Sequence, residues 1–143
     1  MTRSKDIGTR AETAVVNLAK EIGFEYSTRI ALSGANDRGD VMLTRHPLTI
    51  IEVKAGKTAQ SASLNQIKKW LKETEKERRN ASASHAFLVV QRQGFGVGRV
   101  ENWELWTNDN DHYGYLQARY GLIPAAMFEL GPFLREVRQW GWK

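Results

Sequence analysis

The chain has 143 residues, of which 41% are hydrophobic and 26% are charged, and this predicts a single domain spanning residues 1–143. It contains no cysteine, which excludes disulfides and thiolate metal sites, and no apolar stretch approaches the roughly 20 residues of a membrane helix. The net charge is +5 and the isoelectric point is about 9.6, which favours a polyanionic partner. Because the N-terminus is polar, we expect a cytoplasmic protein without membrane contact.

The first half of the chain predicts a helix followed by three strands. Apolar residues recur at helical spacing over residues 8–24, with Thr9 as the expected N-cap and Gly23 as the stop. A strand is expected over residues 24–32 and a loop over residues 33–39. Two further strands follow at residues 40–44 and 48–55, joined by a turn at His46-Pro47.

The second half predicts a helix and then more sheet. The helix covers residues 63–80, with Leu64, Ile67 and Leu71 on its inner face. After it come expected strands at 85–91, 103–107 and 126–130, a flexible turn at 93–99, a loop at 108–115, and a final helix opening at Pro132. The order αβββαβ, with more sheet and a helix behind it, predicts an α/β fold with a mixed central β-sheet flanked by helices.

Three charged residues lie in or beside apolar strands, where unpaired charges are costly. Asp40 opens one strand, and Glu52 and Lys54 share one face of the next because side chains alternate along a strand. If the two strands pair, the carboxylates of Asp40 and Glu52 converge, and with the Val53 carbonyl they form a hard oxygen site of the kind that Mg²⁺ or Mn²⁺ prefers. Such a site, with the Lys54 ammonium beside it, suits phosphate chemistry. The alternative is a solvated strand face.

This arrangement resembles the core motif of the PD-(D/E)XK nuclease superfamily. The segments GTRAETAVVNLAKEIGF, SGANDRGD and IIEVKAG are similar to the archaeal-type Holliday junction resolvases and their phage relatives, and WLKETEKERRNA is similar to actinophage members. The resemblance covers about residues 8–106, so residues 107–143 are expected to form a C-terminal extension that packs on the core or on a dimer interface. Gly39 stands where the superfamily has proline before the aspartate.

The resemblance implies that Glu12 is a first-helix carboxylate that assists the metal or its water. The residues alone offer a second interpretation, because Thr9-x-x-Glu12 is a capping box in which Glu12 reaches back to a backbone N–H. Gln66, followed four residues later by Trp70, is reminiscent of exonuclease branches of the superfamily and is predicted to be catalytic. Ser63-x-x-Gln66 is a capping box as well.

Several polar and basic residues are candidates for phosphate contacts. Ser33 and Arg38 lie in the loop before Asp40, and the alternative there is an ordinary turn. Lys68 and Lys72 belong to a basic stripe on the second helix, but Glu73, Glu75 and Glu77 alternate beside it, so a salt-bridged exposed helix is equally compatible. The predicted DNA-binding set is Arg29, Ser33, Arg38, Lys57, Lys68 and Lys72.

Together these features predict a Mg²⁺-dependent endodeoxyribonuclease, in the host cytoplasm if phage-encoded. The resemblance implies that it is structure-selective and acts on four-way DNA junctions as a homodimer. The expected metal set is Asp40, Glu52, Val53 and Glu12, and Mn²⁺ is expected to substitute. Two alternatives remain: a nuclease of the same fold acting on flaps, nicks or duplex DNA, and an inactive DNA-binding protein.

Overall fold

A sheet of six strands organises the computed structural model, which describes residues 2–31, 37–107 and 126–143. The strands lie side by side in chain order from β1 to β6. β3 and β4 run parallel, and the other neighbouring pairs run antiparallel. The strands are β1 (Thr28–Arg29), β2 (Val41–Arg45), β3 (Leu48–Lys54), β4 (His85–Val90), β5 (Glu104–Thr107) and β6 (Ala126–Glu129).

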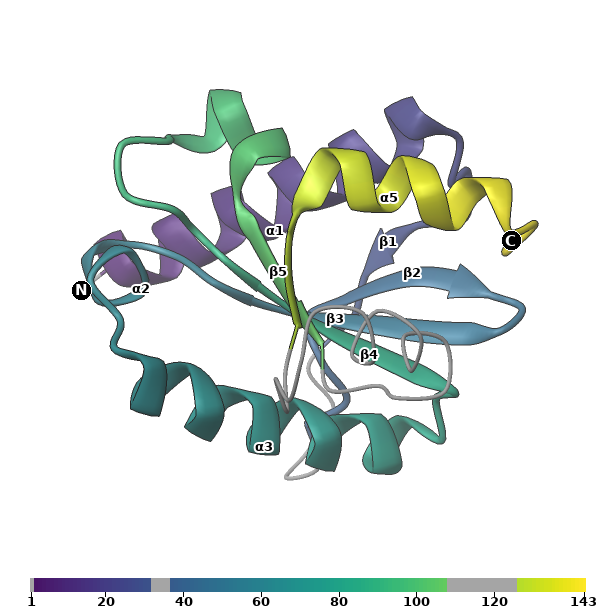
Figure 1. Cartoon of the computed structure of the whole chain (residues 1–143), viewed down its shortest axis with the longest axis horizontal. Helices are drawn as coiled ribbons and strands as arrows, with labels where there is room; N and C mark the ends of the chain where they lie inside the picture. The colour runs from purple at the N-terminus through teal and green to yellow at the C-terminus, as the bar shows by residue number, and fades with distance from the viewer. Residues whose placement is uncertain (1, 32–36, 108–125) are drawn as a thin grey trace.

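Helices cover both faces of this sheet (Figure 1). α3 lies against one face, where it contacts β3 and β4, while α1 and α5 lie on the other face with η1. The helical elements are α1 (Thr2–Ile22), α2 (Lys57–Gln60), α3 (Leu64–Ala81), η1 (Val97–Asn102) and α5 (Leu130–Gln139). The prediction of an α/β chain with a mixed sheet flanked by helices is therefore confirmed. No helix in the described ranges is long and apolar enough to cross a membrane.

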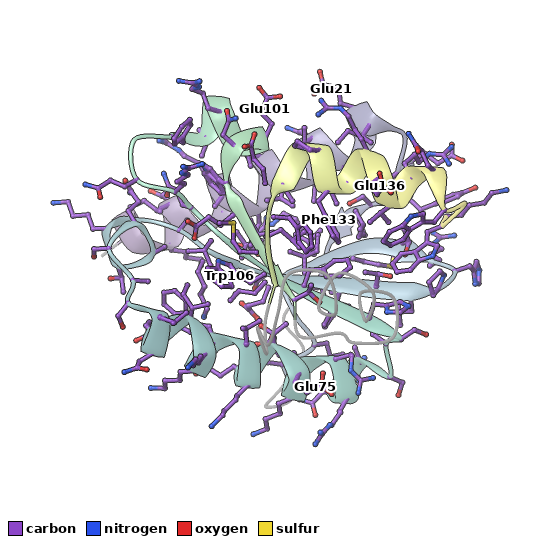
Figure 2. The ribbon with its side chains drawn as sticks, viewed as in Figure 1. Glu21, Glu75, Glu101, Trp106, Phe133 and Glu136 are labelled. Atoms are coloured by element: carbon purple, nitrogen blue, oxygen red, sulfur yellow. The ribbon has the colours of Figure 1, made fainter. Side chains whose placement is uncertain are left out.

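The hydrophobic core is divided by the sheet. The alternation of β3 points Ile51 and Val53 toward α1 and α5, and Glu52 and Lys54 toward α3. β4 is buried along its whole length because helices cover both of its faces. Phe133 extends from α5 toward the sheet (Figure 2) and meets Phe87 of β4 edge to face at 5.2 Å. Each side chain of β3 thus belongs clearly to one layer or the other.

The first helix begins earlier than predicted. α1 starts at Thr2 and continues through Gly8, because a single glycine costs a helix only about 1 kcal/mol. Thr9 is therefore inside the helix and is not its N-cap, so the capping-box interpretation of Glu12 is wrong. The stop at Gly23 is confirmed: its φ is +124°, and its N–H donates to the carbonyls of Ala19 and Lys20.

Other boundaries were less accurate. The strand expected over residues 24–32 is reduced to the two residues of β1, and α2 was not predicted. α5 opens at Leu130, two residues before Pro132. Leu64 was expected inside but is 57% exposed, because it is the first residue of α3, just after the Ser63 cap. The loop expected at 108–115 lies outside the described residues.

Gly39 adopts a backbone conformation that explains why no proline stands there. Its φ is +95°, whereas proline is fixed near −65°. A Cβ at this position would lie 3.1 Å from Ile50 Cδ1. The chain therefore passes close over β3 at this glycine and delivers Asp40 to the start of β2.

Candidate active site

Asp40 is fixed between two strands by its backbone and its side chain. Its N–H donates to the Ile51 carbonyl at 3.0 Å, and its own carbonyl accepts from Ile30 N–H at 2.8 Å. Its Oδ2 accepts from the Val53 N–H at 2.8 Å. Since the N–H and C=O of one strand residue point to the same edge, the Val53 carbonyl lies on the side that faces Asp40. Pairing of the two strands thus brings Asp40 beside Glu52 and Val53.

Glu52 is an acidic side chain inside the protein. It is only 5% exposed, and its Oε2 has no hydrogen-bond partner among the described residues. Burial, followed by its contacts with the carboxyl groups of Asp40 and Glu77, raises the pKa of Glu52 to about 12. The raised pKa favours the protonated form of Glu52, so a cation bound here would compete with a proton.

Glu77 is a further member of the site and was missed in the sequence. It was interpreted as part of an exposed, salt-bridged helix face, but it is only 7% exposed, and its Oε2 also lacks a partner among the described residues. The pKa of Glu77 is raised to about 7, chiefly by burial. The contact with Glu52 lowers this pKa, while the nearby charges of Asp37 and Asp40 raise it. The signal was present, because Glu77 follows Ile67, Trp70 and Thr74 at helical spacing on the buried stripe of α3.

Glu12 reaches this region from α1. Its carboxylate lies 3.7 Å from Arg29 of β1 and is largely buried. Burial and the charge of Asp40 raise the pKa of Glu12, while Arg29 opposes the shift. The influence of Asp40 on Glu12 shows that the two carboxylates share one electrostatic environment. Arg29, a member of the predicted DNA-binding set, pairs with Glu12, and its side chain is 46% exposed.

Lys54 lies beside Glu52 on the α3 side of β3, as the alternation predicts. Its Nζ is 4.0 Å from Glu73 Oε2 and 5.6 Å from the centroid of the Trp70 ring. Trp70, which the sequence left open as a core residue, is buried. The side chain of Lys54 is 30% exposed, so its ammonium group remains open to an approaching anion.

The remaining predicted residues of the described ranges lie before β2, on α2 and on α3. The Ser63 hydroxyl accepts from the Gln66 N–H at 3.2 Å, so half of that capping box is present. Gln66 is eleven residues before Glu77 on α3, about 16 Å along the helix axis. It is also one helical turn before Trp70, whose ring lies beside Lys54, so its catalytic role stays a prediction. Ser33 lies outside the described residues. Exposed positions are occupied by Arg38, Lys57, Lys68 and Lys72.

The site as a whole is acidic and suits a hard cation. Its carboxylates come from α1, from the segment before β2, from β3 and from α3. They belong to Glu12, Asp37, Asp40, Glu52 and Glu77. Buried oxygens without donors are costly in a protein and are satisfied by divalent metals that prefer oxygen ligands. The residues present therefore fit a Mg²⁺ or Mn²⁺ centre with a lysine next to it.

Comparisons with known proteins add no family to this description. Neither the scan against family models, nor the search of curated proteins, nor the search of solved structures finds a match for the chain.

Proposed function

We propose that this protein is a metal-dependent endodeoxyribonuclease with a PD-(D/E)XK type of core. The observation that carries the proposal is the hydrogen bond of 2.8 Å from Val53 N–H to Asp40 Oδ2. It joins the aspartate to the Glu52-Val53-Lys54 segment within one paired sheet. The isolated triplet Glu-x-Lys would carry little weight, but its pairing with Asp40 and the burial of Glu52 support the assignment.

Asp40, Glu52 and the Val53 carbonyl would hold Mg²⁺ or Mn²⁺, with Glu12 beside them. When bound, such a metal lowers the pKa of a water and polarises a phosphate oxygen. Glu12, whose raised pKa reflects burial and the charge of Asp40, is suited to hold or accept a proton from water at this edge. Lys54 supplies positive charge where negative charge develops on the phosphate during hydrolysis.

The assignment of Lys54 rests on its position. Its ammonium group lies near Glu73 and over the Trp70 ring of α3, and the side chain as a whole is 30% exposed. The pair with Glu73 is long at 4.0 Å and partly solvated, so it is weak and easily exchanged for a phosphate oxygen.

For the substrate we propose branched DNA, with the four-way junction preferred and a homodimer as the acting form. The net charge of +5 supports a polyanionic partner. Exposed basic residues lie before β2, on α2 and on α3, namely Arg38, Lys57, Lys68 and Lys72. Two symmetric cuts require two sites, and two-fold dimers are the commonest arrangement for presenting them.

A gel assay tests this proposal. Four-way junction, flap, nicked and linear duplex DNA are each incubated with the protein in Mg²⁺ or in chelator, and the same set is offered to Asp40→Asn. We expect Mg²⁺-dependent cleavage, fastest on the junction and absent in the variant. Cleavage of all four substrates alike would favour a general nuclease, and binding without cleavage in Mg²⁺ and in Mn²⁺ would leave an inactive DNA-binding protein.

A further inference from the structure

We propose that Asp37, Glu52 and Glu77 form a divalent cation site of their own on the α3 side of the sheet. These residues come from the segment before β2, from β3 and from α3. One carboxylate oxygen of each lies within 4.8 Å of the corresponding oxygens of the other two. The site shares Glu52 with the proposed catalytic set, and Asp37 and Glu77 belong to it alone.

The two buried members supply evidence beyond the clustering of acids. Glu52 and Glu77 are 5% and 7% exposed, and one oxygen of each is buried without a hydrogen-bond partner among the described residues. Acceptors left in this state destabilise a fold unless a proton or a cation satisfies them. Lys54 of β3 pairs with Glu73, and Arg78 of α3 pairs with Glu75.

Asp37 is held in place by contacts that do not use its second oxygen. Its Oδ1 accepts from the Gly39 N–H at 2.9 Å, and its backbone carbonyl accepts from Asn80 Nδ2 of α3, also at 2.9 Å. Asn80 lies one helical turn beyond Glu77, so the contact ties the segment before β2 to the part of α3 that carries the site. The chain thus preorganises Asp37 toward Glu77.

The chemistry of the three ligands selects a hard cation. All are carboxylates, which excludes the soft ligand sets preferred by copper or by structural zinc. Mutual separations within 4.8 Å are compatible with three oxygens that contact one hard divalent cation, whether Ca²⁺, Mg²⁺ or Mn²⁺.

A cation here would connect β3, α3 and the segment that leads into Asp40. This role does not depend on nuclease activity, and it can be measured without DNA. Because Asp40 Oδ2 already accepts from Val53 N–H, the proposed site can be isolated by substituting Asp40. Asparagine retains an oxygen for that hydrogen bond while removing the charge of the neighbouring centre.

The test is a calorimetric titration of the full chain with Ca²⁺, carried out in the Asp40→Asn background. Adding Glu77→Gln or Asp37→Asn should weaken Ca²⁺ binding by at least about 10-fold. Adding Glu75→Gln, the matched control from the same helix with an ion pair to Arg78, should leave it unchanged. Circular dichroism checks that each variant is folded. If Glu77→Gln does not fold, the Ca²⁺ affinity of Asp37→Asn tests the site, because Asp37 is exposed and its substitution leaves the core intact.

Equal Ca²⁺ affinity in the Glu77 and Asp37 variants and in their background, or no binding by the background protein, would overturn the site. The result is separate from that of the cleavage assay. Ca²⁺ binding that depends on Glu77, in a protein that cuts no DNA, would support this site and reject the nuclease proposal. DNA cleavage by a protein whose Ca²⁺ binding does not depend on Glu77 would support the nuclease proposal and reject this site.

Discussion

Glu77→Gln should stabilise the metal-free protein at alkaline pH, although it replaces a residue of the core. Burial raises the pKa of Glu77 from its ordinary value of 4.5 to about 7. A carboxyl group with a raised pKa in the folded state contributes its full stability below pH 4.5, and that contribution is lost as the pH rises through about 7. Glutamine has nearly the same shape but cannot ionise, so the stability of the variant does not fall as the pH rises through the pKa of Glu77.

The size of the effect follows from the pKa. Raising it from 4.5 to about 7 corresponds to about 3 kcal/mol of unfolding free energy, since one pKa unit is worth about 1.4 kcal/mol. This is an upper limit, because a buried amide without partners also costs about 1–3 kcal/mol. We expect a net gain of up to about 2 kcal/mol at pH 8, or up to roughly 8 °C in melting temperature for a chain of this length. At pH 4 only the cost of the buried amide remains, so the variant should be less stable than the wild type.

The measurement is thermal unfolding in chelator between about pH 4 and pH 8.5, with Glu101→Gln as the control. Glu101 loses the same charge but points into solvent (Figure 2), with its side chain 54% exposed. The wild type and the control should lose stability together as the pH rises, while Glu77→Gln loses less. The reasoning would be refuted if Glu77→Gln lost as much stability between pH 4 and pH 8 as the wild type and Glu101→Gln do.

The other predictions concern the proposed chemistry. Asp40→Asn and Glu52→Gln should each abolish Mg²⁺-dependent cleavage in the gel assay while circular dichroism shows an intact fold, and near-normal cutting by either would contradict the assignment. Lys54→Ala should lower the single-turnover rate by about 10²-fold or more with little change in DNA affinity, whereas a pure loss of affinity would make it only a phosphate anchor. Glu12→Gln should melt close to wild type yet cleave much more slowly, and full activity would remove Glu12 from the site.

The sequence predicted best where one periodic pattern dominated. β2 and β3 were found because their apolar runs are bounded by Gly39 and by the turn at His46-Pro47. Their pairing follows from the short turn, and the position of Asp40 beside Glu52 follows from the pairing. α3 was located by its Ser63 cap and its helical spacing. In these cases local preference and tertiary packing agree, so the sequence alone is sufficient.

Prediction failed where tertiary contacts override the local pattern. The early start of α1 was hidden by Gly8, which is tolerated in a helix although it weakens it. Glu77 was judged from its charge and its basic neighbours, whereas its position relative to Ile67 and Thr74 placed it on the buried side. Asp37 lies in a segment without periodicity, so its approach to α3 through Asn80 had no signal in the sequence.

The burial of Glu77 is the feature that most needs a cause. A leucine or glutamine at that position would satisfy the helix and the sheet at lower cost, since an ionised carboxylate in the core is stabilising only when it is paired. The chain instead places Glu77 against Glu52, another buried acid, and fixes Asp37 nearby with hydrogen bonds from Gly39 and Asn80. Local rules are broken in this way where a protein keeps a function at the expense of stability. The proposed divalent cation would turn the same arrangement from a destabilising one into a link between α3 and the sheet.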